Sequence, residues 1–291
     1  MKIHFIGLGE RIMSDLAATL SQQGHKITGS DVSLPKPVLH SLANTTVMPE
    51  QPGWFPQKIQ PSLDKVIVGR KVHRDNPELQ AAQQLGLPIC SHPEYIYSYA
   101  QNKQRIVITG GEEKNLLCLL VLHVLEHLHQ PFDYVVDSPH LNTSVRLSDA
   151  PIIILEGDLA PVSPTDTQPQ SLCYQHNIAL ISGIGWESSD TYATQGSYLK
   201  QLTRLADVSP KGGTLIYYEG DRLIKVIGSQ ARADVKAVPY QAHAHRHEGG
   251  TTYMVTPQKE IPLQHAASTR AVAGAQQLLH NLAIQDPQLY E

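Results

Sequence analysis

The sequence has little of what marks secreted or membrane-spanning proteins. Its 291 residues include only three cysteines, far apart and without a CxxC pair, so we expect free thiols in a reducing compartment rather than a disulfide framework. No apolar run is long enough to span a bilayer. The apolar start "IHFIGLG" is followed at once by Glu10 and Arg11, so we expect no signal peptide.

The chain also lacks an excess of positive charge. It has no run of five basic residues, and its formal net charge is −4 at pH 7. Both features argue against binding to nucleic acid or to a membrane surface. Together with the missing membrane and export signals, they predict a soluble cytoplasmic protein.

Short apolar stretches alternate with stretches of helical spacing, an order typical of a parallel, doubly wound α/β sheet. The proline-spotted stretches 34–40 and 48–61 are predicted to be irregular, and 225–263 is predicted to form an antiparallel edge. "LLCLLVLHVL" is apolar on all sides, which predicts a buried helix with His123 in the core. The length supports two domains, and we place their boundary near Asn102, giving residues 1–102 and 103–291.

The first glycine-rich turn, "GLGERIMS", follows an apolar strand and precedes a helix. Gly7 and Gly9 allow a tight turn at which a phosphate could approach the helix N-terminus, and Asp31 has the spacing of a ribose-binding carboxylate. The third glycine of the GxGxxG pattern is missing, since Ile12 stands there, and Glu10 adds a negative charge. The turn therefore leaves two interpretations, a nucleotide-type site or a tight turn without a ligand. A nicotinamide-dependent oxidoreductase would depend on this turn and Asp31 alone.

A second strand, loop and helix follow in "IVITGGEEKNLLCLLVLHVLEH". The layout is that of a phosphate-binding loop with a lysine, yet two adjacent glutamates stand where phosphate would lie.

These motifs, taken with the stretches between them, resemble a known family. "MKIHFIGLGERIMSDLAATLSQQGHKITGSD", "DNPELQAAQQLGLPICSHPE", "RIVITGGEEK", "NIALISGIGWE" and "IPLQHAASTRAVAGAQQLLHNLAI" resemble, in order and spacing, the Mur ligases of the UDP-N-acetylmuramate:L-alanine ligase and murein peptide ligase type. The resemblance implies a Rossmann-like, UDP-sugar-binding N-terminal domain followed by a P-loop-type central ATPase domain. It stops where the C-terminal Mur domain would begin, so that domain is expected to be absent from this sequence.

By this resemblance, the first domain would hold a UDP-muramoyl ligand. The family pattern has a further glycine where this chain has Glu10. The implied contacts are Gly7, Gly9, Met13, Ser14, Ser30, Asp31 and Asn76.

The family's ATP motifs are degraded in this chain. The family loop reads roughly G-[TS]-H-G-K-T-T, with a lysine for the transferred phosphate and a hydroxyl for magnesium. Glu113 replaces its second glycine and Asn115 replaces the hydroxyl residue. The corresponding loop here consists of Gly110, Gly111, Glu112, Glu113, Lys114 and Asn115, and the other remnants of the catalytic motifs are Glu156, Asp158 and His265.

Two functional interpretations remain open. The first is a catalytically inactive or impaired homologue from peptidoglycan synthesis or recycling, which binds a UDP-muramoyl compound or a partner and uses neither ATP nor a metal. The second is an active ATP- and magnesium-dependent ligase with a divergent loop. Among the other features, His243, His245 and His247 alternate as in a polar edge strand or, less commonly, a zinc site, and Trp54 either pins a loop or stacks on a ligand.

Overall fold

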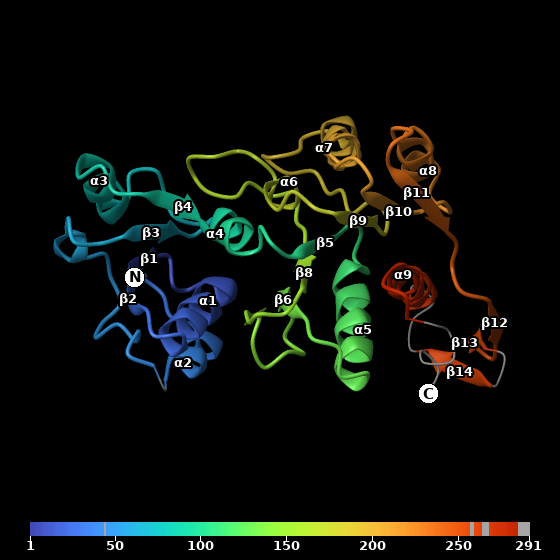
Figure 1. Ribbon diagram of the computed structural model, residues 1–291, viewed down its shortest axis with the longest axis horizontal. Coiled ribbons are helices and arrows are strands. Elements are labelled where there is room, and N and C mark those ends of the chain that lie inside the picture. Colours follow the sequence, from blue (N-terminus) through green and yellow to red (C-terminus); the bar gives the residue numbers. More distant parts are fainter. Residues whose placement is uncertain (44, 257–258, 264–267, 285–291) are drawn as a thin grey trace. The chain divides into compact units, whose positions relative to one another are not determined.

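The computed structural model describes residues 1–43, 45–256, 259–263 and 268–284 (Figure 1). The chain forms two compact units. Unit 1 contains Met1–Asn102, Asp133–Asp149 and Ala160–Tyr174, and unit 2 contains Lys103–Phe132, Ala150–Leu159 and the described residues from Gln175 onward. The predicted domains, 1–102 and 103–291, did not anticipate that two later segments belong to unit 1.

Unit 1 is built on a parallel sheet with the strand order β2-β1-β3-β4. Ile6 at the end of β1 pairs with both Ser30 of β2 and Val68 of β3, so the carboxyl ends of these strands are aligned. The next turns therefore start at one edge of the sheet, where α/β folds bind ligands. The strands are β1 (Lys2–Ile6), β2 (Lys26–Ser30), β3 (Lys65–Val68) and β4 (Ile89–Ser91), and the later segments add the antiparallel pair β6 (Asp133–Val135) and β7 (Val145–Arg146).

The helices of unit 1 begin with caps that the sequence provides. Asn76 caps α3 (Pro77–Gln84), and Ser91 with Glu94 forms a capping box for α4 (His92–Tyr99). In α1 (Arg11–Gln22), Met13, Leu16 and Leu20 are buried at helical spacing. The short helix α6 (Gln170–Cys173) belongs to this unit as well.

The prediction that residues 34–40 and 48–61 are irregular was wrong in part. Residues Lys36–Leu42 form α2, with Pro37 in its first turn and Val38 and Leu42 buried, and Pro56–Lys58 form one 3₁₀ turn, η1. Proline is tolerated in the first turn of a helix because the N–H group it lacks has no partner there. The prolines thus mark the start of a helix rather than its absence.

The main sheet of unit 2 is also parallel, with its strands in the order β11-β10-β9-β5-β8. Ile108 of β5 pairs with Glu156 at the end of β8, and Thr109 pairs with Ile181 at the end of β9. The loop after β5 therefore starts beside the ends of both neighbouring strands. The strands are β5 (Gln104–Thr109), β8 (Ile152–Glu156), β9 (Ile178–Ile181), β10 (Thr214–Tyr218) and β11 (Lys236–Tyr240).

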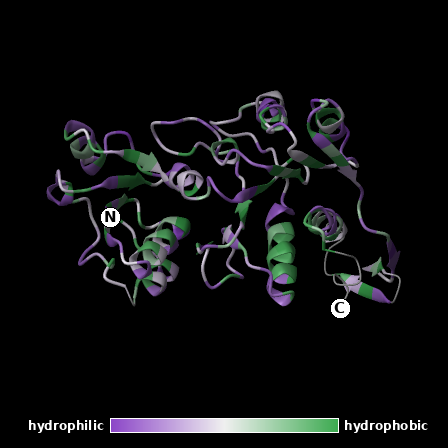
Figure 2. Ribbon diagram, viewed as in Figure 1, coloured by the Kyte–Doolittle hydropathy of each residue, from purple (hydrophilic) through white to green (hydrophobic). Residues whose placement is uncertain are grey.

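The helix after this loop, α5 (Lys114–His127), is hydrophobic over most of its length (Figure 2). Its buried residues, such as Cys118 and Leu125, lie along one side. His123 is exposed, so the prediction of a core histidine in a helix buried on all sides was wrong. An apolar composition alone does not tell how many sides of a helix are covered.

The prediction of an antiparallel edge over residues 225–263 was correct only for its second half. Arg222–Ser229 form α8, and β11 pairs with β10 in the parallel direction. Beyond them β12 (His245–Glu248), β13 (Thr251–Val255) and β14 (Glu260–Leu263) form a small antiparallel sheet. The remaining helices of unit 2 are α7 (Gln195–Asp207) and α9 (Ser268–Asn281), and α9 packs against α5 and β10.

Within the described ranges, no helix combines the length and the apolar character that crossing a membrane would require.

The three cysteines are free thiols, and burial raises the pKa of each. The pKa of the half-buried Cys90 rises to about 11 and that of Cys173 to about 12. Because the thiolate is the reactive species, we expect iodoacetamide at pH 8 to modify each native thiol at least about a hundredfold more slowly than the same thiol in urea. Mass spectrometry of timed samples measures this. A native cysteine that reacts at the unfolded rate would contradict it.

Candidate functional site

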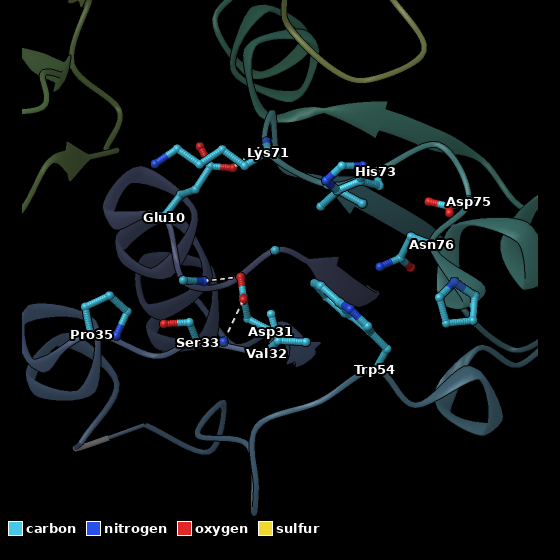
Figure 3. Close-up of a pocket in the computed structure, with 14 residues that line it drawn as sticks. Glu10, Asp31, Val32, Ser33, Pro35, Trp54, Lys71, His73, Asp75 and Asn76 are labelled. Carbon is cyan, nitrogen blue, oxygen red and sulfur yellow. Dashed lines mark hydrogen bonds between the residues drawn. The ribbon is translucent and has the colours of Figure 1, made fainter.

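Unit 1 contains a cavity of about 690 Å³ at the carboxyl ends of β1, β2 and β3 (Figure 3). The strand order reverses direction at β1, since the chain continues first to β2 on one side and later to β3 on the other. Crevices at such a switch point are the usual ligand sites of open α/β sheets. The lining residues are Gly7, Gly9, Glu10, Asp31, Val32, Ser33, Pro35, Trp54, Lys71, Val72, His73, Asp75, Asn76 and Pro77.

The first glycine turn forms one wall of this cavity. Gly7 has a φ of +95°, a conformation that favours glycine, and its N–H group donates to the carbonyl of Ser30 at 2.9 Å. The N–H group of Gly9 donates to Oδ2 of Asp31 at 2.8 Å, and Oδ1 of Asp31 accepts from the N–H group of Ser33. The turn and Asp31 therefore hold each other in place, and the N–H groups of Gly7 and Gly9 are already paired within the chain.

Glu10 is the N-cap residue of α1, but its side chain does not cap the helix. Its Oε1 accepts a hydrogen bond of 3.1 Å from the N–H group of Lys71, in the turn that follows β3. A Cβ atom on Gly69 would lie 2.7 Å from the same oxygen, so a larger residue at position 69 would displace the carboxylate from this place. The Glu10 carboxylate thus lies against the turn after β3.

Asn76 and Trp54 line the cavity from the side of α3. Asn76 is 4% exposed, and its Oδ1 accepts from the N–H groups of Glu78 and Leu79 at the start of the helix. These two bonds fix the orientation of the amide, so Nδ2 faces the cavity (Figure 3). Throughout the described ranges, Nδ2 has no hydrogen-bond partner. Trp54 is half-buried and packs against the core of the unit.

The residues predicted for a UDP-muramoyl ligand do not all reach this cavity. Gly7, Gly9, Asp31 and Asn76 line it. Met13 and Ser14 are buried within α1, and Ser30 is buried at the end of β2. Lys71, His73 and Asp75 also line the cavity and were not predicted, because they follow β3 in a stretch without a recognisable motif.

The second candidate site is the loop after β5 in unit 2. Gly110 has a φ of +127°, and a Cβ atom there would lie 2.7 Å from the backbone nitrogen of Gly183. The loop is therefore packed closely against the segment after β9. Glu113 is the N-cap residue of α5, and Glu112 beside it is exposed.

Glu113, Lys114 and Asn115 of this loop contact charged residues of nearby elements. Glu113 is only 9% exposed and forms an ion pair with Arg270 of α9, whose guanidinium also lies over the ring of Tyr218. Nζ of Lys114 lies 3.7 Å from Oε1 of Glu156 at the end of β8. Nδ2 of Asn115 donates to the other oxygen of Glu156 at 3.3 Å. Arg270 was not expected from the sequence, since it lies 157 positions after its partner.

The loop does not fit a magnesium-bound triphosphate. Glu113 stands where the family pattern has its second glycine. Its buried carboxylate lies beside Gly111, in space that a phosphate would need. Lys114 and Asn115, which would contact phosphate and magnesium, instead contact Glu156. Asp158 follows β8 and is half-buried. His265, the remaining predicted remnant, lies outside the described residues.

Of the alternating histidines, His245 and His247 are exposed and His243 is half-buried. His245 and His247 have ring centroids 5.3 Å apart, and His247 Nδ1 bonds to Thr252 Oγ1 at 2.9 Å. Over the described parts of the chain, no group of three or more histidine, cysteine, aspartate or glutamate side chains is placed to hold a metal ion.

The fold is that of an α/β protein with two strand-turn-helix sites, and a carboxylate of the chain itself lies at each turn, Asp31 at the first and Glu113 at the second. The family model "Mur ligase family, catalytic domain" matches residues 2–104. The chain is a homologue of the Mur ligases, as the sequence predicted.

Similar proteins extend this match over most of the chain. A UDP-N-acetylmuramate–L-alanyl-gamma-D-glutamyl-meso-2,6-diaminoheptandioate ligase of Escherichia coli is 22% identical over 77% of this chain and 50% of its own. A UDP-N-acetylmuramate–L-alanine ligase of Arthrobacter is 24% identical over 86% of this chain and 53% of its own. The chain spans about half the length of the curated relatives it matches.

Solved structures confirm the fold. The ligase for UDP-N-acetylmuramate and L-alanyl-gamma-D-glutamyl-meso-diaminopimelate from Neisseria meningitides superposes with a TM-score of 0.82 at 17% identity, over 97% of this chain and 94% of the other. The UDP-N-acetylmuramate–alanine ligase of Thermotoga maritima gives a TM-score of 0.74 at 17% identity, over 99% and 67%.

Proposed function

We propose that this Mur ligase homologue is a binding module of peptidoglycan synthesis or recycling that does not turn over ATP. Its ligand, a UDP-muramoyl compound or a fragment of one, would occupy the cavity of unit 1. One observation carries the loss of catalysis: the Glu113 carboxylate is buried at the start of α5 and paired with Arg270. The loop therefore already holds a negative charge where the phosphates would bind.

The electrostatic cost of adding a second anion here is large. A carboxylate about 4 Å from a phosphate charge costs about 4 kcal/mol at an effective dielectric constant of 20, or roughly a thousandfold in affinity. Breaking the Glu113–Arg270 pair to move the carboxylate away would leave a buried charge without its partner. Either route disfavours the triphosphate.

A calorimetric titration with ATP and magnesium tests this proposal. We expect no binding heat with the natural protein at 1 mM ATP and none with Lys114→Ala. Restoring the family residues in Glu113→Gly/Asn115→Thr is expected to produce measurable ATP binding. The matched control, Glu112→Gly/Asn115→Thr, removes one glutamate from the same loop but leaves Glu113 in place, so it should remain without binding.

The proposal would be overturned by magnesium-dependent ATP hydrolysis or amide-bond formation that Lys114→Ala abolishes. That result would support the alternative, an active ATP-dependent ligase of UDP-N-acetylmuramate with a divergent loop. The alternative is favoured by Lys114, Glu156 and Asp158, which still lie at the carboxyl ends of β5 and β8. It requires ATP and magnesium to displace the contacts that Glu156 makes.

A further inference from the structure

Two histidines of the strand β12 lie side by side in unit 2. His245 and His247 are two positions apart, so their side chains stand on the same face of the small antiparallel sheet, and both are exposed. Their ring centroids are 5.3 Å apart, with the ring planes at 80° to each other. Because β12 lies at the end of the strand order β12-β13-β14, the pair is placed at an edge of this sheet (Figure 1).

Hydrogen bonds at Nδ1 orient both rings. His245 Nδ1 lies 2.8 Å from the carbonyl oxygen of His243, and since a carbonyl only accepts, Nδ1 carries the proton and Nε2 keeps its lone pair in the neutral ring. His247 Nδ1 bonds to Oγ1 of Thr252, which is 7% exposed. Among the described residues, neither Nε2 has a hydrogen-bond partner. Histidines that bind metals have this arrangement, in which an oxygen atom holds one ring nitrogen and the other faces the ion.

The spacing of the two rings fits a single tetrahedral metal ion. With Zn–N bonds of about 2.0–2.1 Å, two imidazoles on one tetrahedral zinc ion have ring centroids about 5 Å apart. The rings of His245 and His247 already have this separation, so they can chelate an ion without a change in the backbone. Imidazole suits zinc, copper and nickel, whereas magnesium and calcium prefer oxygen ligands.

The charges around the pair favour a cation. Arg246 stands between the two histidines in sequence, so its side chain lies on the opposite face of the strand. There its Nε donates to Glu260 at 2.8 Å, and its guanidinium also forms an ion pair with Glu248. The arginine is therefore directed away from the imidazoles and balanced by two carboxylates, which leaves a net negative charge around the edge.

We propose that His245 and His247 form a dihistidine site for a divalent transition-metal ion of the zinc class, with both Nε2 atoms as ligands. Thr252 is a positioning residue that fixes the ring of His247. Within the described ranges no third histidine, cysteine, aspartate or glutamate is placed to join the pair, so the remaining positions of the ion are left to water. The site uses no residue of the loop after β5 and is independent of the proposed loss of ATP turnover.

A calorimetric titration of the whole chain with zinc chloride, after removal of metal with a chelator, tests the site. We expect saturable zinc binding that His245→Ala and His247→Ala each weaken at least tenfold, because one imidazole alone cannot chelate. The matched control is His243→Ala. It removes the third alternating histidine but keeps the backbone carbonyl that orients His245, so the zinc affinity should not change.

A further variant tests the positioning residue. Thr252→Val keeps the shape of the side chain but removes Oγ1, and we expect about tenfold weaker zinc binding with an unchanged circular dichroism spectrum. In nitrogen-15 spectra of the imidazoles, zinc should shift the Nε2 signals of His245 and His247.

Three results would overturn the inference. They are no saturable zinc binding up to 1 mM, an equal loss of affinity in His243→Ala, and Nε2 signals of the pair that zinc does not move. An unchanged affinity in Thr252→Val would overturn the role of that residue. None of these outcomes alters the ATP titration, so the two proposals fail separately.

Discussion

Lowering the pH from 7 to 5 is expected to reduce the free energy of unfolding by about 3–4 kcal/mol through two buried histidines. Burial, with a smaller contribution from Arg70, lowers the pKa of His92 to about 3, and burial next to Arg105 lowers that of His176 to about 4. The unfolded chain takes up these protons below about pH 6.5, whereas the folded protein does not until pH 3 to 4. The contribution of these histidines to the free energy of unfolding is therefore fully present above pH 6.5. Below pH 6.5, each histidine lowers the free energy of unfolding by about 1.4 kcal/mol per pH unit.

Urea unfolding at pH 5, 6 and 7 measures this dependence, and substitutions assign it. Neither ring nitrogen of His92 has a hydrogen-bond partner, so His92→Met should leave stability at pH 7 nearly unchanged and remove about half of the acid loss. His176→Gln should remove the other half. It should also lower stability at pH 7, because the 2.9 Å hydrogen bond between His176 Nε2 and Ser209 Oγ is lost. As a control, His123→Gln changes an exposed histidine and should not alter the slope. An unchanged slope in both buried variants would contradict the expectation.

Gly9→Ala is expected to destabilise unit 1 by about 3 kcal/mol. The added methyl group would lie 2.3 Å from the carbonyl oxygen of Ser33 and 2.8 Å from Oδ2 of Asp31. Because the nearer atom is backbone, it cannot move aside by a simple rotation, and the turn that lines the cavity must shift. Urea denaturation measures the loss.

Gly24→Ala is the matched control in the same unit. Gly24 has a φ of +86° but no atom within 4 Å of a new Cβ, so only the backbone conformation should cost energy, about 1 kcal/mol. If both substitutions cost the same, the tight packing of Gly9 against Ser33 and Asp31 would not be what makes glycine necessary there.

Local pattern predicted most of the central strands because burial on both faces leaves a simple signature. "KIHFI", "KVIV" and "IALI" form apolar strands, and the residues of "PELQAAQQ" form a helix with its cap. The elements that the sequence did not predict are short or have polar residues at the surface. The strand β11 has mostly exposed or half-buried residues and contains Pro239, and its direction follows from α8 and the sheet rather than from its own residues.

The candidate sites were predictable where residues follow strands directly. Gly7, Gly9 and Asp31 lie at strand ends, and parallel strands bring such ends together. The partners of Glu10 and Glu113 were not predictable, because they come from the turn after β3 and from α9. The sequence shows that a carboxylate stands at a phosphate turn, but only the fold shows which groups neutralise it.

The interleaving of the two units has a consequence for synthesis on the ribosome. The side chain of Arg11 donates to the carbonyls of Ser138 and Leu141, and Oδ2 of Asp15 accepts from the N–H group of Ser144. Unit 1 therefore cannot complete these contacts when residue 102 has been synthesised, and must wait while β5 and α5 of unit 2 emerge. A nascent chain that stops at Asn102 would leave the side chains of Arg11 and Asp15 without these partners, so the first turns of α1 reach their final contacts only after residue 144 has been synthesised.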